Sequence, residues 1–160
     1  MVKKRKVLVV FYSKTGNTRR IARIIARRID GGIDEVIDLK KREGLFNLII
    51  AIKDAAKNNV TRIKYKINPK GYKVIIIGSP IWAGRIAPAI RTYLIKNKDK
   101  IGKIALFMTS LSNKNKKALI DIERTSKKPI AVLHITKRDI KLKRDIEKIN
   151  EFIKKLKYED

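Results

Sequence analysis

The chain has 160 residues, 44% of them hydrophobic, and carries 41 lysine and arginine residues against 15 acidic ones, a formal net charge of +26. This length and composition fit one compact domain over residues 1–160 and exclude a disordered chain. The absence of cysteine excludes disulfides, iron–sulfur clusters, thiolate metal sites and cysteine nucleophiles. No apolar run approaches about 20 residues and no signal-peptide pattern opens the sequence, so we expect a cytoplasmic protein without a membrane span.

The first half of the chain alternates short apolar runs with segments of helical periodicity. The first apolar run is unbroken, as expected of a strand buried on both faces, whereas the second alternates with polar residues and predicts a more exposed strand. Gly31 and Gly32 are expected to end the first helix. In chain order the expected strand, helix, strand and helix cover residues 7–11, 18–29, 33–39 and 44–58. The second helix is expected to gather on one face Leu45, Leu48, Ile49, Ile52 and Ala56.

The second half opens with a polar and irregular segment over residues 59–70. It then alternates strands and helices, and Pro88 lies near the start of the next helix, where proline is tolerated. The expected elements cover residues 74–77, 87–97, 104–108, 114–127, 130–135 and 139–157. The face of the final helix that is expected to point inward carries Ile146, Ile149, Phe152, Ile153 and Leu156.

Strand and helix therefore alternate five times along the chain. This order predicts an α/β protein with a parallel five-stranded sheet and helices on both faces. Right-handed crossovers leave only a few doubly wound strand orders. Ligands of such sheets bind at the carboxyl ends of the strands, so the loops that follow the strands carry the functional information.

The loop after the first strand favours the binding of a phosphate. It lacks the glycine patterns of dinucleotide-binding domains and P-loops, and it lacks the acidic residues of receiver domains. Instead, hydroxyl and amide side chains surround one glycine at the start of a helix, where backbone N–H groups bind anions. Simple capping of that helix by Asn17 or Ser13 is the alternative interpretation, although one residue suffices for a cap.

Residues 9–18 resemble the phosphate loop of flavodoxins, and the resemblance extends along nearly the whole chain. It implies a flavodoxin-like, doubly wound sheet of five parallel strands in the order 2-1-3-4-5. It also implies FMN as the cofactor, because this loop in flavodoxins wraps the terminal phosphate of FMN. By similarity, that role falls to Ser13, Lys14, Thr15, Gly16, Asn17 and Thr18.

A second motif, G-S-P-I-W-A-G over residues 78–84, resembles the flavodoxin loop that flanks the isoalloxazine ring. Trp82 is the only tryptophan of the chain, and a flat indole suits stacking on a flavin. Packing of this tryptophan over the strand end is the alternative. The resemblance implies contact with the ring by Pro80, Ile81, Trp82, Ala83 and Gly84.

A third flavin loop is expected after the fourth strand, with Thr109, Ser110 and Leu111 at the cofactor. Here the chain departs from well-known flavodoxins, which often stack a tyrosine on the outer face of the flavin. No aromatic residue lies between Phe107 and the following helix. We therefore expect either that Leu111 covers the ring edge or that the ring is open to a substrate or partner.

These features predict an FMN-binding electron-transfer protein, although the fold by itself does not choose among flavodoxin-like functions. We identify no catalytic residue, since the single histidine, His134, lies in an expected strand, and the sparse acidic residues indicate no metal site. One alternative is an FMN-dependent oxidoreductase of the quinone-reductase or protoporphyrinogen-oxidase type, and another is a flavin-free basic module that binds nucleic acid. The charge favours an acidic redox partner protein or non-specific binding of polyanions, and a lysine-rich proteome is its simplest source.

Overall fold

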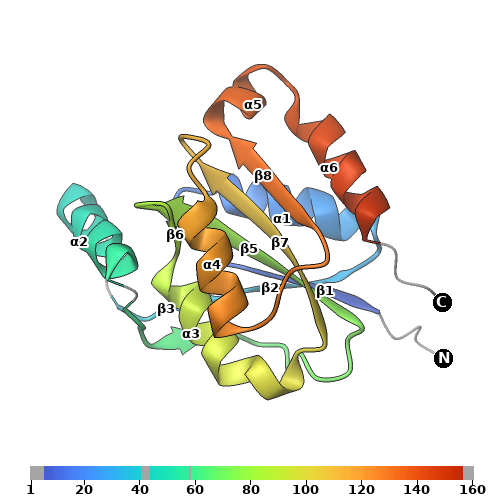
Figure 1. The fold of residues 1–160 in the computed structure, drawn as a ribbon, viewed down its shortest axis with the longest axis horizontal. Helices are drawn as coiled ribbons and strands as arrows, with labels where there is room; N and C mark the ends of the chain where they lie inside the picture. Colours follow the sequence, from blue (N-terminus) through green and yellow to red (C-terminus); the bar gives the residue numbers. More distant parts are fainter. Residues whose placement is uncertain (1–5, 41–43, 58, 157–160) are drawn as a thin grey trace.

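The structure, a computed structural model, describes residues 6–40, 44–57 and 59–156, and Figure 1 shows its fold. Its centre is a sheet with five main strands, all parallel, in the order β2-β1-β5-β7-β8. These strands are Gly32–Glu35, Val7–Phe11, Val74–Trp82, Lys103–Ser110 and Val132–Thr136. Counting only the parallel strands, this order is 2-1-3-4-5, so the predicted fold class is confirmed.

Helices cover both faces of the sheet (Figure 1). Alternate residues of β1 divide between two hydrophobic cores: Val7 and Val9 belong to one, Leu8 and Val10 to the other. This burial on both faces explains the unbroken apolar run of the strand. The first core includes residues of α1 (Asn17–Arg28) and α6 (Asp145–Lys155), the second those of α3 (Pro88–Asn97) and α4 (Lys116–Thr125). Within the described residues, no helix is long and apolar enough to span a bilayer.

The strand predicted over residues 33–39 is divided in two. β2 ends at Glu35, and β3 (Ile37–Asp38) pairs with β4 (Ile63–Lys64) in a separate antiparallel sheet. Asp34 anchors this arrangement, because its buried Oδ2 accepts hydrogen bonds from the backbone N–H groups of Lys66 and Ile67, at 2.9 and 2.7 Å. These bonds tie the segment predicted to be irregular to the main sheet, and part of it becomes β4.

The final helix, predicted as one element over residues 139–157, is two helices. α5 (Lys137–Lys141) precedes α6, and Lys143 between them has a positive φ of 56°. Thr136 and Asp139 form a capping box at the start of α5, which explains why the helix begins there. Ile146, predicted to face inward, is 36% exposed in the first turn of α6.

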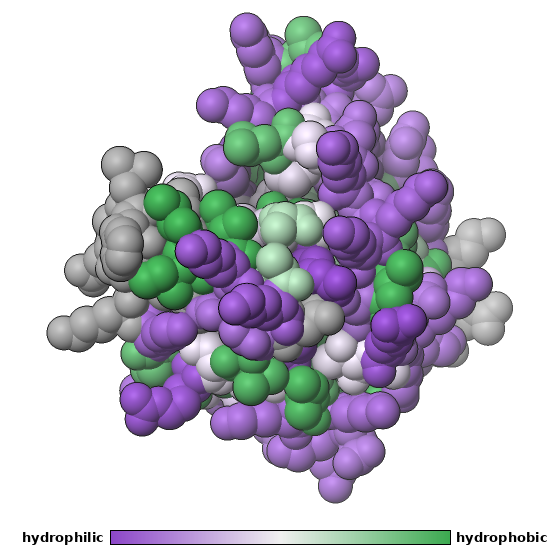
Figure 2. Space-filling model, turned by 60° about the vertical axis from the view of Figure 1, so that its left-hand side comes forward, coloured by the Kyte–Doolittle hydropathy of each residue, from purple (hydrophilic) through white to green (hydrophobic). Residues whose placement is uncertain are grey.

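Helix α2 (Gly44–Ala56) stands beside the sheet near the end of β5 (Figure 1). Three residues predicted to share one face of this helix are exposed, namely Ile49 by 53%, Ile52 by 38%, and Ala56. Ala55 is buried instead, since helical spacing does not tell which face meets the sheet. The side chains of the two predicted leucines and residue 58 lie outside the described part of the chain. Figure 2 shows hydrophobic surface gathered on this side, within a largely hydrophilic exterior.

Several helices differ from prediction in their ends. α1 ends at Arg28, and the left-handed residue after it is Asp30, with φ of 48°, rather than either predicted glycine. Gly32 instead begins β2. α4 is two residues shorter than predicted at each end.

Candidate functional site

The structure gathers the three predicted loops around one cavity at the carboxyl end of the sheet. Its volume is about 850 Å³, toward the upper end of small-molecule sites. Every predicted site residue except Ser13 and Gly16 lines it: Lys14, Thr15, Asn17, Thr18, Pro80, Ile81, Trp82, Ala83, Gly84, Thr109, Ser110 and Leu111. Ser112 and Asn113, which complete the expected third flavin loop, also line it. Lining residues that the sequence did not reveal are Ile52, Lys114, Asn115, Lys116, Lys117, Ile135, Lys137 and Ile140.

The first loop, residues 12–18, leaves the N-terminus of α1 without a side-chain cap. Gly16 is the N-cap residue, with φ of 94°, and makes no side-chain capping hydrogen bond. The backbone N–H of Gly16 donates to Ser13 Oγ at 3.1 Å, so Ser13 shapes the loop without lining the main cavity. Of the two residues in the capping alternative, Ser13 therefore satisfies only the N–H of the N-cap residue, and Asn17 makes no capping bond among the described residues. The uncapped first turn directs backbone donors toward any anion placed there.

The first and third loops are joined by a buried hydrogen bond. The Oγ1 atoms of Thr18 and Thr109 lie 2.8 Å apart, and both side chains are buried. Thr15 and Asn17, in contrast, are exposed at the mouth of the first loop. The three polar side chains of this helix start therefore differ in role, because Thr18 is held by a protein partner while the other two face outward.

The second motif is a strand end and a hairpin rather than a loop. β5 continues to Trp82, and β6 (Arg85–Ile86) folds back on it with Trp82 opposite Arg85. The two turn residues, Ala83 and Gly84, have φ of 50° and 75°. Positive φ at both positions is typical of a two-residue type I′ hairpin, in which glycine is favoured.

Trp82 lies in this hairpin at the wall of the cavity. It is half-buried, and its ring meets that of Tyr12 edge to face, with centroids 5.8 Å apart and planes at 89°. The two predicted alternatives are compatible here, because the indole borders the cavity and also packs against the second core. Its face toward the cavity is the surface on which a flat ring can stack.

A buried ionic network, which the sequence did not reveal, holds the hairpin against α3 and α4. Arg85 Nη1 donates to Asp121 Oδ1 at 2.6 Å, and Arg91 Nη2 donates to Asp121 Oδ2 at 3.2 Å. Asp121 and Arg91 are 5% and 4% exposed. Burial lowers the pKa of Arg91, and the charge of Asp121 opposes that shift. Arg85 is the cross-strand partner of Trp82, so this network positions the tryptophan.

The third loop, residues 109–115, has an exposed tip and a fixed base. Leu111 at the tip is 83% exposed. At the base, His134 of β8 contacts Ser110 and Asn115 at 2.6 and 3.1 Å. The structure places His134 in a strand, as predicted, but the sequence offered no local signal for these contacts because the partners are 24 and 19 residues away.

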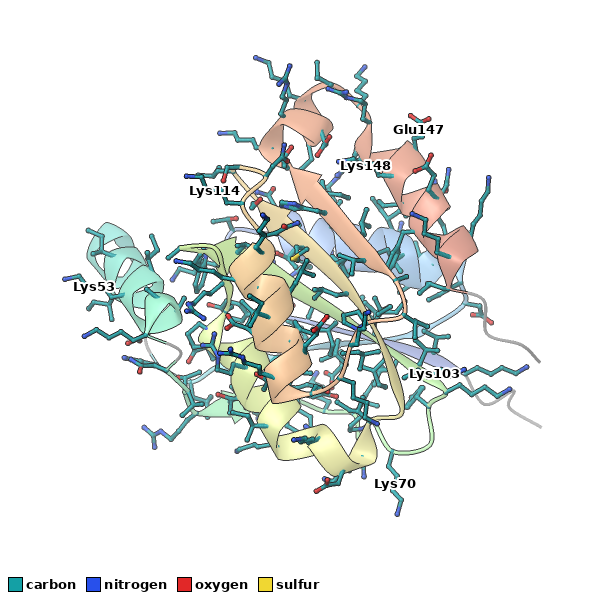
Figure 3. All side chains as sticks on the ribbon, in the orientation of Figure 1. Lys53, Lys70, Lys103, Lys114, Glu147 and Lys148 are labelled. Atoms are coloured by element: carbon teal, nitrogen blue, oxygen red, sulfur yellow. The ribbon has the colours of Figure 1, made fainter. Side chains whose placement is uncertain are left out.

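The electrostatic character of the cavity is positive. The described residues that line it include five lysines and no aspartate or glutamate. Lys53 of α2 and Lys114 of the third loop project from this end of the molecule (Figure 3). No group of three histidine, aspartate or glutamate side chains suited to a metal ion occurs in the described ranges. The lining of the cavity therefore combines positive charge with apolar side chains such as Ile81 and Trp82.

These features define the class of the protein: it has the flavodoxin-like α/β fold, with its cavity at the carboxyl ends of the strands. Solved structures support this assignment, although no protein-family model and no curated protein sequence matches the chain.

One similar structure is the crystal structure of a flavoprotein from Lactobacillus acidophilus NCFM in complex with FMN, with a TM-score of 0.69 and 25% identity over 88% of this chain and 97% of that chain. The apo form of the flavoprotein from that organism, solved by NMR, gives a TM-score of 0.64 and 27% identity over 86% and 95% of the two chains. The apo form of an NADH:FMN oxidoreductase (EmoB) has a TM-score of 0.53 and 14% identity over 96% and 91%, which shows the fold alone.

Proposed function

We propose that this chain binds FMN without a covalent bond and serves as an electron-transfer protein of the flavodoxin type. The observation that carries the proposal is the convergence of the first loop, the hairpin and the third loop on one cavity of about 850 Å³. The 25% identity to an FMN-bound flavoprotein, over 88% of this chain, supports the choice of cofactor.

The residues of the first loop fit the phosphate end of FMN. The first turn of α1 has no side-chain cap and no acidic residue, so its backbone donors and its helix dipole favour a dianionic phosphate. Lys14 supplies a cation at the cavity wall, and the exposed Thr15 and Asn17 supply further donors. Gly16 permits the turn, since its φ of 94° is rarely adopted by residues with a side chain.

The remainder of the cavity fits the isoalloxazine ring. Trp82 and Ile81 form an aromatic and aliphatic wall, and Ile52 of α2 adds apolar surface. When bound, FMN supplies the acceptance and release of electrons. The chain's own residues bind the phosphate, orient the ring beside Trp82 and exclude water from the side that faces the hairpin.

The visible spectrum of the purified protein, followed by titration of the apoprotein with FMN and with riboflavin, tests this proposal. We expect flavin absorption bands, one FMN per chain, and much weaker binding of riboflavin because it lacks the phosphate. A colourless protein that also fails to bind added FMN contradicts the proposal.

An FMN-dependent oxidoreductase is the second candidate, and the exposed third loop favours it. Leu111 is 83% exposed and the described loop presents no aromatic side chain, so a substrate has access to the cavity from this side. Steady-state turnover with NADH or NADPH and a quinone separates this candidate from a carrier. Rapid turnover that needs no partner protein supports the enzyme.

The charge of +26 underlies two further parts of the proposal. We propose an acidic redox partner in the cytoplasm, because a lysine-lined cavity mouth steers negatively charged surfaces toward the flavin. Electron-transfer rates with such a partner fall as ionic strength rises. A flavin-free module that binds nucleic acid instead predicts a colourless protein. The logarithm of its affinity for DNA or RNA then falls linearly with the logarithm of salt concentration.

A further inference from the structure

The third loop is closed at its base by the only imidazole of the chain. His134 Nε2 lies 2.6 Å from Ser110 Oγ at the end of β7, and His134 Nδ1 lies 3.1 Å from Asn115 Nδ2, the N-cap residue of α4. Ser110 and Asn115 both line the cavity. One side chain of β8 therefore connects the start and the end of the loop that borders the candidate site.

Counting protons fixes the direction of each hydrogen bond. Ser110 Oγ also lies 2.5 Å from the carbonyl oxygen of Ser112, which only accepts, so the single hydroxyl proton points there. His134 Nε2 must then carry a proton and donate it to Ser110 Oγ. Nδ1 carries none and accepts from the Asn115 amide. The same count excludes Ser110 as a nucleophile activated by His134, because that role needs an unprotonated Nε2.

The surroundings of His134 keep it neutral. The pKa of His134 is lowered by burial of the ring and by the nearby charge of Lys148, while Asp139 acts in the opposite direction. Lys148 Nζ donates to the His134 carbonyl oxygen at 3.0 Å and to Asp139 Oδ2 at 2.9 Å. Figure 3 shows Lys148 beside β8, with Lys114 at the third loop.

Asp139 stays charged over the pH range in which histidine titrates. For Asp139, burial alone would raise the pKa, but hydrogen bonds from Lys148 and Thr136 outweigh it and lower the pKa to about 2. Asp139 of α5 is thus charged at neutral pH, and it is paired with Lys148 of α6 at 2.9 Å. The contacts from β7 and the N-cap of α4 are uncharged, namely Ser110 and Asn115.

We propose that His134 is a positioning residue for the cofactor site, which as the neutral Nε2–H tautomer holds the third loop closed and on protonation releases Asn115. Protonation turns Nδ1 from an acceptor into a donor, so the hydrogen bond from Asn115 Nδ2 is lost and Asn115 has to reorient its amide or leave. The distal anchor of the loop is thereby weakened while Ser110 stays bound. We expect the affinity for the cofactor to fall as His134 becomes protonated. This consequence rests on the proposed binding of FMN.

NMR of the apoprotein tests, without any cofactor, whether the neutral His134 ring holds the third loop. Because the chain has one histidine, every imidazole signal belongs to His134. We expect long-range ¹H–¹⁵N spectra to show the Nε2–H tautomer, and the ring to titrate below its ordinary pKa. The amide signals of residues 110–115 move with the same midpoint. An Nδ1–H tautomer, or loop amides that do not follow the ring, overturns the proposal.

FMN dissociation constants measured between roughly pH 5 and pH 8 test whether protonation of His134 weakens cofactor binding. We expect wild-type affinity to fall about tenfold more than that of His134→Gln, whose amide still donates to Ser110 and does not titrate. The second ionisation of the FMN phosphate, near pH 6, affects both proteins equally and cancels in this ratio. His134→Ala is expected to bind more weakly at every pH.

The outcomes separate the inference from the proposed function. Equal pH dependence in wild type and His134→Gln overturns the role of His134 while FMN binding at pH 8 still stands. No FMN binding by the wild type at pH 8 overturns the proposed function, and the NMR titration then still decides whether His134 holds the loop.

Discussion

Thr18 and Thr109 share a hydrogen bond between buried hydroxyl groups, with 2.8 Å between the Oγ1 atoms of residues 91 positions apart. Thr18 lies in the first turn of α1, and Thr109 lies near the end of β7. The bond therefore fixes the first loop against the third across the carboxyl end of the sheet. Both residues were predicted to contact the cofactor, and the structure adds this mutual contact.

Replacing either threonine by valine is expected to destabilise the protein. Thr18→Val or Thr109→Val leaves the other buried hydroxyl without its partner, which costs roughly 1–3 kcal/mol. The double variant removes both groups and is expected to lose less than the sum of the single variants. Urea unfolding of all four proteins measures this cycle, and strictly additive losses contradict a direct bond.

Thr15 offers a cleaner test of phosphate binding because its side chain is exposed. Thr15→Ala is expected to weaken FMN by about tenfold, the equivalent of one hydrogen bond to a charged group, with little change in stability. Riboflavin affinity should stay as in the wild type, since riboflavin has no phosphate. An equal loss for both flavins would remove Thr15 from the phosphate site.

The fluorescence of Trp82 is expected to report contact with the bound ring. Since Trp82 is the only tryptophan and lines the cavity, FMN should quench its emission almost completely, and removal of FMN should restore it. A second tryptophan reporter, far from the cavity, controls for quenching by energy transfer over a distance. This reporter is Tyr72→Trp in a Trp82→Phe background, because residue 72 lies before the start of β5, at the opposite end of the sheet. Equal quenching of the two reporters argues against contact.

Gly78 is required by the packing of Phe107. A Cβ at Gly78 lies 2.1 Å from the Phe107 Cζ, and the two residues are opposite each other on β5 and β7. Gly78→Ala is expected to cost 1–3 kcal/mol or more of stability, because the ring is fully buried and has no room to move. Gly102→Ala is the control, since a Cβ at Gly102 has its nearest neighbouring atom, the carbonyl oxygen of Lys73, at 3.7 Å. Adding Phe107→Leu to Gly78→Ala should recover part of the loss in thermal unfolding.

The hydroxyl group of Tyr93 is expected to lower the stability of the protein. Its ring is fully buried and meets Tyr65 edge to face at 5.0 Å, and its Oη has no hydrogen-bond partner among the described residues. Burial raises the pKa of Tyr93, with smaller contributions from Tyr65 and Asp34. Tyr93→Phe keeps the packing and removes the unpaired group, so we expect a gain of about 1 kcal/mol in unfolding free energy.

The matched control for Tyr93 is its ring partner. Tyr65 Oη donates to Asn97 Oδ1 at 3.3 Å, so Tyr65→Phe loses a bond and is expected to lower stability slightly. A clear loss of stability in Tyr93→Phe would show that its hydroxyl is satisfied in solution.

The order of elements and the three loops of the site could be predicted from the sequence because their signals are local. The unbroken apolar run of β1 records burial on both faces of a parallel sheet, and Gly16 marks the turn into α1 with a φ that glycine adopts freely. Parallel strands also end at one edge, so motifs that follow β1, β5 and β7 must meet there.

Other features depended on contacts that local patterns do not encode. Asp34, a polar residue in a strand, draws the segment at Ile67 to the sheet and divides the predicted second strand. The exposure of Ile49 depends on where α2 lies, which helical periodicity leaves open.

By itself, then, the sequence determined the fold class and the three segments that meet at the cavity, since periodicity and backbone preferences act between near neighbours. Only the tertiary structure decided how those residues are held: Thr18 by Thr109, Trp82 through Arg85 and Asp121, and the third loop by His134. A hydrogen bond or a buried ion pair joins side chains that the fold brings together, and nothing in either local sequence names the partner.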